Sequence, residues 1–379
     1  MKSKRNSFYI TASLMLFALG CLIGCSTLAK KLSPKAETGV VLARRAMVRS
    51  SYAPVAADLV TVNRGDQVDI LDSDTADNGE RWMRVRVHDE QSTEGWIEAR
   101  NIMTQKVLDS TRELAQADAN IPAQASGQLR ASTNLRLSPD RSNNDNIIMR
   151  LESGSTFEIV GWKRVPKPKT SETTETDIAP KAGTVQQNTG RRRRGESDEQ
   201  QEPEEINELW YKVKLEPSIS PAPAGWIYGK QVELKVPSDI IFYRTGREFV
   251  AWRRLDEEAD SNEAGTRDAA REAKPGSWVI LERSNSNEPH RVDEPDFDRI
   301  YVLGYDKVNQ EHYTAYRSPD IKGFLPLRLE TQGGEKFFVI RVLGEDGQIN
   351  EVRYKVYRDD RGLLKVTAMN EPPRERHRR

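Results

Sequence analysis

The two cysteines of the 379-residue sequence, Cys21 and Cys25, are the first residues whose chemistry needs an explanation. They stand four positions apart at the end of an apolar stretch over residues 8–24, and a short basic segment precedes that stretch. A disulfide between them closes too small a loop to constrain the chain. Basic residues followed by a short apolar run are typical of a secretory signal, so we expect both thiols to belong to a targeting segment.

Histidines and carboxylates are the other groups that could support catalysis or metal binding. Four acids within residues 293–298 could hold calcium or act as a general acid and base, but they lack the glycine and the terminal glutamate of a calcium loop. The histidines show no short zinc-ligand spacing, although distant residues could still converge in the fold. We therefore expect no enzyme, metal site or cofactor. The acids are Asp293, Glu294, Asp296 and Asp298, and the histidines are His88, His290, His312 and His377.

The residues around Cys25 carry a resemblance. Leu22-Ile23-Gly24-Cys25 resembles the lipobox of bacterial lipoproteins. The resemblance implies removal of residues 1–24, diacylation of the Cys25 thiol and acylation of the new amino terminus, and Ser26 favours sorting to the outer membrane. Several acyl chains hold a soluble protein on a bilayer stably. The alternative is an uncleaved membrane anchor with two incidental thiols. Lipidation of Cys25 leaves no thiol for a cysteine peptidase mechanism.

An internal repeat follows the targeting segment. Each copy contains an apolar-Arg start, a glycine turn before an alternating strand, a Trp-led strand and a Gly-Trp-Ile strand, in the same order. In the Trp-led strand of the first copy, Met83, Val85 and Val87 alternate with arginines, which predicts one buried face. Each copy should therefore form a small antiparallel barrel of about five strands. The landmarks lie at 47–50, 62–71, 80–87 and 95–97, and again at 134–137, 151–160, 208–215 and 225–227.

This order of landmarks resembles the bacterial Src-homology-3 (SH3) domain family, over residues 38–106 and 128–236. The resemblance implies non-catalytic SH3-like barrels that tether envelope proteins or hydrolases to peptidoglycan or to other proteins. The second copy departs from the pattern, because residues 163–207 separate its second strand from its Trp-led strand. That insert is rich in Pro, Thr, Glu and Arg and poor in large apolar residues, so we expect it to be disordered.

Four tryptophans in the repeat allow two interpretations, a barrel core or an aromatic platform for a ligand. We expect Trp96 and Trp226, in the Gly-Trp-Ile strands, to lie in the core. For Trp82 and Trp210, at the strand starts, both interpretations stay open. If a binding groove exists, we predict that Tyr52, Trp82 and Trp210 line it.

The remaining segments complete the predicted organisation. Residues 25–37 and 107–127 read as linkers, the second either a short helix or flexible. Residues 237–370 alternate between hairpin turns and predict an antiparallel meander of seven or eight strands, as a sandwich or a barrel. This domain could be filled or could enclose a small-ligand cavity. A basic tail occupies 371–379.

Composition completes the prediction. The fold class is mainly β, two small barrels followed by a β-meander domain, and the formal net charge of zero predicts no nucleic-acid partner. A charged fraction of 31% and a mean hydropathy of −0.72 indicate solvated linkers. We expect a non-catalytic cell-envelope lipoprotein, held at the membrane by its N-terminal lipid, that binds peptidoglycan or an envelope protein. The alternatives are a small-ligand carrier or hydrolase with its site in the C-terminal β domain, and a surface-displayed protein. The membrane face and oligomeric state are not encoded.

Overall fold

A computed structural model describes residues 37–142, 144–168, 206–256, 275–285 and 290–370. Within these ranges the protein is mainly β with one α-helix, which confirms the predicted fold class. The chain divides into two compact units, described separately below. The first unit comprises residues 1–39, 45–62 and 66–99, and the second comprises 40–44, 63–65 and 100–379. Cys25 with the signal segment, most of the predicted insert and the basic tail lie outside the described residues.

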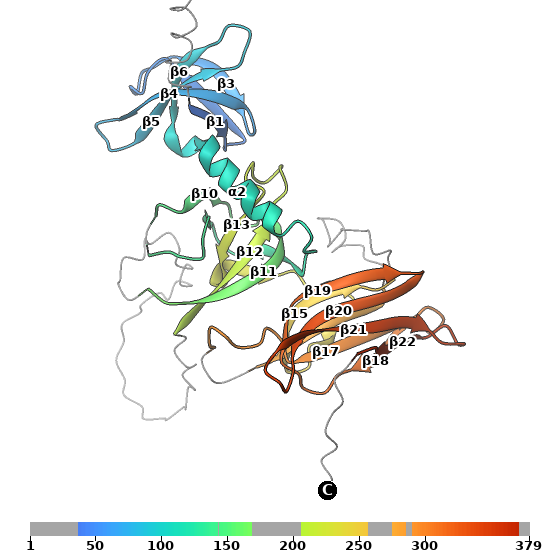
Figure 1. The fold of residues 1–379 in the computed structure, drawn as a ribbon. Helices are drawn as coiled ribbons and strands as arrows, with labels where there is room; N and C mark the ends of the chain where they lie inside the picture. Colours follow the sequence, from blue (N-terminus) through green and yellow to red (C-terminus); the bar gives the residue numbers. More distant parts are fainter. Residues whose placement is uncertain (1–36, 143, 169–205, 257–274, 286–289, 371–379) are drawn as a thin grey trace, which may run out of the picture. The chain divides into compact units, whose positions relative to one another are not determined.

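The first repeat forms a seven-stranded sheet rather than about five strands (Figure 1). Its strands lie in the order β3-β2-β6-β5-β4-β1-β7. They are β1 (Glu37–Val41), β2 (Arg45–Arg49), β3 (Asp58–Asn63), β4 (Gln67–Thr75), β5 (Arg81–Val87), β6 (Glu94–Glu98) and β7 (Ile102–Thr104), with a 3₁₀ turn η1 (Ala99–Asn101) before β7.

The second repeat has the same topology. Its order, β10-β9-β13-β12-β11-β8-β14, is that of the first sheet with every strand number raised by seven, so the four landmarks of each copy occupy matching strands. The strands are β8 (Ala125–Leu129), β9 (Thr133–Arg136), β10 (Ile147–Leu151), β11 (Thr156–Pro166), β12 (Asn207–Lys214), β13 (Ala224–Tyr228) and β14 (Val232–Leu234), with η3 (Gly229–Gln231) before β14.

The glycine of the Gly-Trp-Ile landmark is explained by the close approach of the neighbouring strand. A Cβ atom on Gly95 would lie 2.5 Å from the carbonyl oxygen of Arg49 and 2.7 Å from Val48. At the matching Gly225, a Cβ atom would lie 2.7 Å from the side chain of Leu135. Only a residue without a side chain lets β2 and β6, or β9 and β13, come together at this point.

Gly95→Ala is therefore expected to lower the free energy of unfolding by about 1–3 kcal/mol, because the added methyl group meets a backbone carbonyl that cannot move aside. Chemical denaturation of the two chains measures the difference. Gly161→Ala is the control, since its Cβ atom would meet nothing within 4 Å. Equal stabilities of Gly95→Ala and the natural chain would contradict this account of the landmark.

Residues 107–127, for which the sequence allows either a short helix or a flexible linker, begin with a helix. Helix α2 (Gln105–Ala117) begins after Thr104, whose hydroxyl accepts a hydrogen bond from the Val107 amide. Its buried residues are Leu108 and Thr111, and it contacts β13 of the second repeat. No helix in the described part of the chain has the length and hydropathy needed to cross a membrane.

Residues 247–368 form the predicted antiparallel meander, as two four-stranded sheets in consecutive strand order. Apolar side chains from both sheets share one core, so the arrangement is a sandwich. The first sheet contains β15 (Arg247–Arg254), β16 (Trp278–Ser284), β17 (Arg299–Asp306) and β18 (Glu311–Arg317), after η4 (Ile241–Tyr243). The second contains β19 (Gly323–Gln332), β20 (Glu335–Leu343), β21 (Ile349–Arg358) and β22 (Leu364–Ala368).

The sheet β15–β18 is buried on both faces in its central strands. Consecutive residues of β16, Val279, Ile280 and Leu281, are each 0% exposed, although their side chains point to opposite faces. Val279 and Leu281 pack into the core shared with β19–β22. Ile280 packs into the core that contains Val213 and Ile227 of the second repeat. Within the second unit, this repeat and the sandwich therefore share a continuous apolar interior.

Strand β11 extends into the segment that the sequence assigns to the insert. Residues 163–166 continue β11 and pair with β12, where Pro166 lies opposite Asn207. The predicted bounds of the insert, 163–207, are therefore wrong at both ends. Residues 163–166 belong to β11 and Asn207 belongs to β12, because the β11–β12 hairpin extends beyond the apolar residues of β11. Residues 169–205 lie outside the described residues.

Candidate functional site

An aromatic pair lies at the surface of the first repeat. The rings of Tyr52 and Trp96 meet edge to face, with centroids 5.1 Å apart and planes at 86°, and both side chains are half-buried. The Tyr52 hydroxyl donates a hydrogen bond of 2.9 Å to the carboxylate of Asp74 on β4. That hydrogen bond to Asp74 also raises the pKa of the Tyr52 hydroxyl, which keeps it a donor. We call this pair the Tyr52–Trp96 surface.

Arg49 positions the loop that carries Tyr52. It lies opposite Trp96 in the pairing of β2 with β6. Its guanidinium donates to the carbonyls of Pro54 at 3.1 Å and Ala56 at 3.0 Å, so the loop after β2 is held against the strand that carries the tryptophan. An ion pair of 3.4 Å with Asp58 adds a third contact to the same side chain. Arg49, the arginine of the landmark at residues 47–50, therefore holds the Tyr52 loop next to Trp96.

Apolar side chains extend the Tyr52–Trp96 surface. Leu59 is 45% exposed, and its Cδ1 atom lies 3.0 Å from the Cβ position of Gly95, next to Trp96. Val55, in the same loop as Tyr52, is 94% exposed. Aromatic and aliphatic groups left exposed together are more informative than a single exposed apolar residue.

The second repeat lacks this surface. Three residues after the matching arginine, Arg136, the chain has Pro139 in place of Tyr52. Trp226 is half-buried, and the ammonium of Lys212 lies 5.9 Å from its ring centroid. Lys212 in turn forms an ion pair of 2.5 Å with Asp118.

An ion pair closes the loop after β9. Arg141 donates from Nε and Nη2 to the carboxylate of Glu208, at 2.5 to 3.1 Å, and the Glu208 side chain is 1% exposed. The Arg141 guanidinium also lies 4.8 Å from the ring centroid of Tyr228. The loop of the second repeat is therefore engaged by its own chain where the first repeat presents Tyr52.

The predicted groove of Tyr52, Trp82 and Trp210 needs correction. Trp82 is 6% exposed and Trp210 is 1% exposed, so both lie in the repeat interiors, and only Tyr52 reaches the surface. The expectation for Trp96 and Trp226 is also wrong, since both are half-buried rather than in the core.

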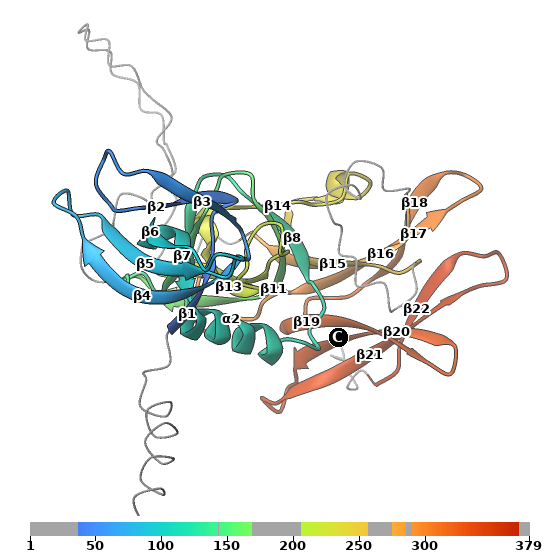
Figure 2. The ribbon, with the colours of Figure 1, turned by 90° about the horizontal axis from the view of Figure 1, so that it is seen from above.

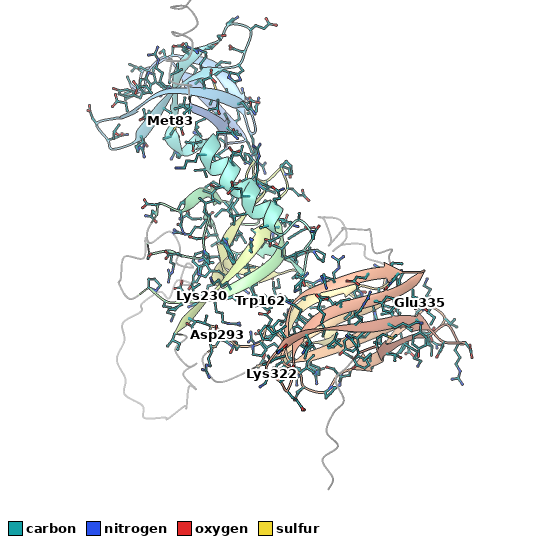
Figure 3. The ribbon with its side chains drawn as sticks, viewed as in Figure 1. Met83, Trp162, Lys230, Asp293, Lys322 and Glu335 are labelled. Atoms are coloured by element: carbon teal, nitrogen blue, oxygen red, sulfur yellow. The ribbon has the colours of Figure 1, made fainter. Side chains whose placement is uncertain are left out.

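Both repeats have a β-bulge at the same place, in the strand that pairs with the tryptophan strand. The pairing of β4 with β5 shifts between Ile70 and Asp72, and that of β11 with β12 shifts between Ile159 and Gly161. A bulge bends its strand and increases the local twist. Trp82 is buried, whereas its neighbour Met83, predicted to be buried, is only half-buried. Figure 3 labels Met83 on the first repeat.

Three of the four acids in residues 293–298 form ion pairs or hydrogen bonds within the protein, and the fourth, Asp293, is exposed. Glu294 forms ion pairs with Arg164 at 3.4 Å, with His290 at 2.7 Å and with Arg283. Among the residues that the structure describes, no group of three or more His, Cys, Asp or Glu could hold a metal ion. Glu294 thus neutralises two arginines contributed by strands β11 and β16.

Asp296 and Asp298 have equally specific partners. Asp296 accepts hydrogen bonds from Trp162 Nε1 and from the amide of Leu325 at 2.9 Å, and burial raises the pKa of its carboxyl. Asp298 pairs with Arg247 and accepts from the Ser284 amide. The Asp296 contacts connect β11 of the second repeat with β19 of the sandwich, and the Asp298 contacts lie within the sandwich.

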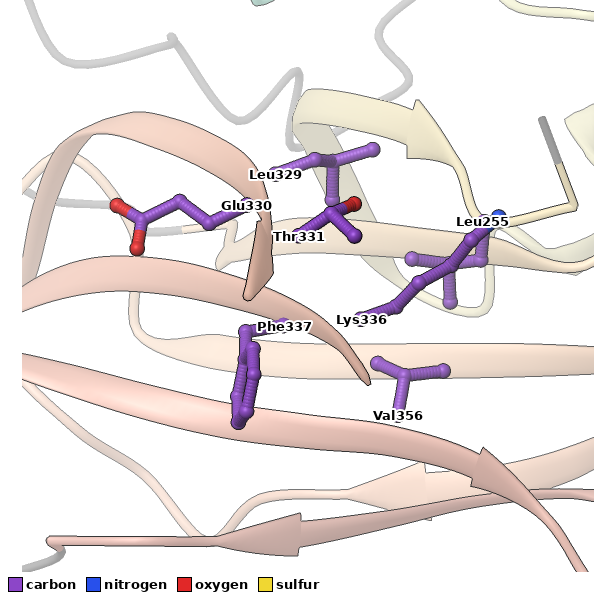
Figure 4. A pocket seen from close by; sticks show the side chains of 7 residues that line it. All are labelled: Leu255, Leu329, Glu330, Thr331, Lys336, Phe337 and Val356. Atoms are coloured by element: carbon purple, nitrogen blue, oxygen red, sulfur yellow. The ribbon is translucent and has the colours of Figure 1, made fainter. Parts of the chain in front are cut away.

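A ligand site in the C-terminal domain is the alternative prediction, and two features bear on it: a cavity in the sandwich and the contacts of His312. A cavity between Leu255, Leu329 and Phe337 measures only about 10 Å³, room for one water molecule (Figure 4). His312 Nε2 lies 2.8 Å from the Gly276 carbonyl, and the ring contacts Tyr243 and Tyr305. His312 is thus packed by partners outside the acidic segment.

Comparison with known proteins adds little to this picture. No protein-family model matches the chain, and no curated protein sequence matches it either. Among solved structures, NlpC1 and NlpC2 from Trichomonas vaginalis align with 76% of this chain at 11% and 12% identity. The alignments cover 91% and 98% of those chains with a TM-score of 0.15 in each case. These values carry no argument about fold or function.

Proposed function

We propose that this chain is a lipid-anchored, non-catalytic cell-envelope protein whose first repeat binds peptidoglycan. The lipobox-like residues ending at Cys25 support the anchor, and the SH3-like order of the landmarks supports a binding role for the repeats. A non-catalytic role is supported by Glu294, Asp296 and Asp298, whose carboxylates contact arginines, a tryptophan and backbone amides.

The observation that carries the proposal is the half-exposed Tyr52–Trp96 surface, present in one repeat and absent from the other. Aromatic rings present a large apolar face together with a polar O–H or N–H group. That combination suits the glycan strands of peptidoglycan, whose sugar rings have apolar C–H faces and hydroxyl or amide rims. Arg49 holds the loop before binding, so less ordering entropy is lost on association.

Retention of the full chain, in mild detergent, on purified cell-wall sacculi tests the proposal. We expect Trp96→Ala to reduce retention by about tenfold or more, because it removes the larger ring of an aromatic contact site. The matched control is Trp226→Ala, which removes the tryptophan of the same landmark in the second repeat and should leave retention unchanged.

The outcomes separate the possible partners. Failure of the folded natural chain to bind sacculi would reject peptidoglycan as the ligand. Equal losses in Trp96→Ala and Trp226→Ala would reject the Tyr52–Trp96 surface as the site. If the chain did not bind sacculi but bound an envelope protein, and Trp96→Ala weakened that binding, the ligand of the Tyr52–Trp96 surface would be a protein.

A further inference from the structure

Three exposed carboxylates border the Tyr52–Trp96 surface. Asp72 and Asp74 belong to β4, and Asp77 belongs to the turn that follows it. Asp72 and Asp74 each accept a hydrogen bond from the next main-chain amide, at 2.8 Å and 2.7 Å. No ion pair engages any of the three among the residues that the structure describes. Their charges are therefore available to a ligand at this surface.

The strand register places Asp72 on the same face of the sheet as Trp96. Strands β2, β6, β5 and β4 lie side by side in this order (Figure 2). Trp96 on β6 lies opposite Arg84 on β5, and Arg84 lies opposite Asp72 on β4. Residues opposite one another in antiparallel strands share a face. Two strand spacings, about 10 Å in total, therefore separate Asp72 from Trp96.

Asp74 and Asp77 act on Tyr52, the other ring of the surface. The Asp74 carboxylate accepts the hydrogen bond of 2.9 Å from the Tyr52 hydroxyl. This hydrogen bond and the charge of Asp74 raise the pKa of the Tyr52 hydroxyl, and the charge of Asp77 raises it further. A cation placed at the aromatic pair would therefore be attracted by both carboxylates.

The arginines beside Trp96 already have acidic partners. Arg49 and Arg84 lie opposite Trp96 on its two neighbouring strands. Arg49 forms an ion pair of 3.4 Å with Asp58, and Arg84 forms one of 2.9 Å with Glu94. These two guanidinium groups are thus matched by carboxylates other than those of β4.

The remaining charges of β5 are balanced as well. Arg86 pairs with Glu94 at 2.7 Å and lies 3.9 Å from Asp69. Glu80 and Arg81, where the turn after β4 meets β5, carry opposite charges. The net charge beside the Tyr52–Trp96 surface is therefore negative, and the ligand group that complements it is a cation.

The rings and the carboxylates together select a ligand with two properties. Trp and Tyr rings pack against apolar C–H faces and also attract cations. A carboxylate forms a charge-assisted hydrogen bond with an ammonium group. A glucosamine unit has both properties on one rigid ring, since its amino group is attached directly to the sugar. An ammonium at the end of a flexible peptide side chain brings no apolar face and loses more conformational entropy on binding.

We propose that the Tyr52–Trp96 surface binds glycan strands at glucosamine units with a free amino group, with the sugar ring against Trp96 and the ammonium at the Asp74 carboxylate. The inference rests on the proposed function and specifies the form of the glycan. N-acetylation turns the ammonium into a neutral amide and removes the charge that Asp72, Asp74 and Asp77 attract. The site therefore distinguishes deacetylated strands from acetylated ones.

Isothermal titration calorimetry on the full chain in mild detergent tests the site with two ligands, a tetramer of glucosamine and a tetramer of N-acetylglucosamine. At mildly acidic pH, where the sugar amine is protonated, we expect the glucosamine tetramer to bind about tenfold more tightly or better. Added salt should weaken binding of the glucosamine tetramer more, because only that tetramer is charged.

Asp74→Asn tests the carboxylate, since asparagine keeps an acceptor for the Tyr52 hydroxyl and removes the charge. We expect this variant to bind the glucosamine tetramer about tenfold more weakly and to bind the N-acetylglucosamine tetramer as the natural chain does. Glu90→Gln, at an exposed glutamate in the turn after β5, is the matched control and should keep the natural preference.

Sacculi separate the amino sugar from other sources of ammonium. A glycan deacetylase exposes sugar amines and leaves the peptide stems unchanged, whereas chemical N-acetylation blocks both kinds of amine. We expect retention of the natural chain to increase several-fold on deacetylated sacculi. Asp74→Asn should lose most of this increase.

The outcomes distinguish this inference from the proposed function. Equal affinity of the natural chain for the two tetramers, or an unchanged preference in a folded Asp74→Asn chain, would overturn the inference. Retention that falls on N-acetylated sacculi but does not rise on deacetylated ones would assign the ammonium to the peptide stems and would also overturn it. Retention that neither treatment alters would reject this inference alone, whereas no retention on any sacculi would reject the proposed function.

Discussion

Arg141→Ala is expected to lower the free energy of unfolding of the second unit by about 3–5 kcal/mol. Removal of the guanidinium leaves the carboxylate of Glu208, 1% exposed, without its bidentate partner. The variant also loses the cation that lies over the Tyr228 ring. Urea denaturation, followed by a probe in the second unit, measures the change.

Two controls test this explanation. Arg112→Ala breaks an exposed ion pair with Asp109 on α2 and should cost no more than about 0.5 kcal/mol. A double variant, Arg141→Met with Glu208→Met, should recover most of the lost stability, since neither charge is then buried alone. If Arg141→Ala lowered the free energy of unfolding no more than Arg112→Ala does, the Glu208 carboxylate would have to be hydrated in solution, which would contradict its burial.

Ile280→Ala and Leu281→Ala are each expected to cost about 2–5 kcal/mol in unfolding free energy. The two residues are consecutive in β16 and both 0% exposed, one facing the second repeat and the other facing β19–β22. In a sheet with one solvated face, one of two consecutive substitutions would be nearly neutral. Chemical denaturation of both variants therefore measures the burial of each face.

The control for this pair is Val292→Ala, at a residue 45% exposed in the acidic segment, with an expected loss below about 0.5 kcal/mol. Because the second repeat and the sandwich share an apolar interior, we also expect each β16 variant to shift a single unfolding transition of the second unit. A large loss for Leu281→Ala alone would show that the repeat does not cover β16 in solution.

Local alternation predicted the strands wherever the pairing is regular. In β21 the buried residues are those that alternation selects, Val352, Tyr354 and Val356. In β20 Phe337 and Val339 are buried as well as the alternating Phe338 and Ile340. Alternation does not hold at the starts of β5 and β12, where Trp82 and Trp210 are buried although they lie on the strand face opposite to Val85 and Val213. A tryptophan at a strand start suits a core and a platform equally, so the residue type does not decide between them.

The sequence of the C-terminal domain also indicates which strands are buried on both faces. The runs Val250-Ala251-Trp252 and Ile300-Tyr301-Val302-Leu303 are continuously apolar, which indicates strands covered on both faces. Which surface covers the outer face depends on contacts between residues far apart in the chain, and local periodicity does not contain that information. The structure assigns it to the second repeat.

The candidate site was predicted only in part. The sequence predicts Tyr52 as a residue that lines a groove if one exists, and it predicts Trp96 in the core, whereas both side chains are half-buried and in contact. The useful signal was the difference between the copies, since Tyr52 follows Arg49 by three residues whereas Pro139 follows Arg136 by the same interval.

Gln124, which directly precedes β8, limits whether one repeat could replace the other during evolution. Its amide side chain accepts from the Leu327 amide at 2.6 Å and donates to the Leu327 carbonyl at 3.1 Å. Its own main chain bonds Ile159 at 2.7 Å and Trp252 at 3.0 Å, so one residue joins β11, β15 and β19. A recombination event that replaced the second copy with a duplicate of the first would remove this junction. Shuffling of modules should therefore be tolerated upstream of α2 and selected against downstream of it.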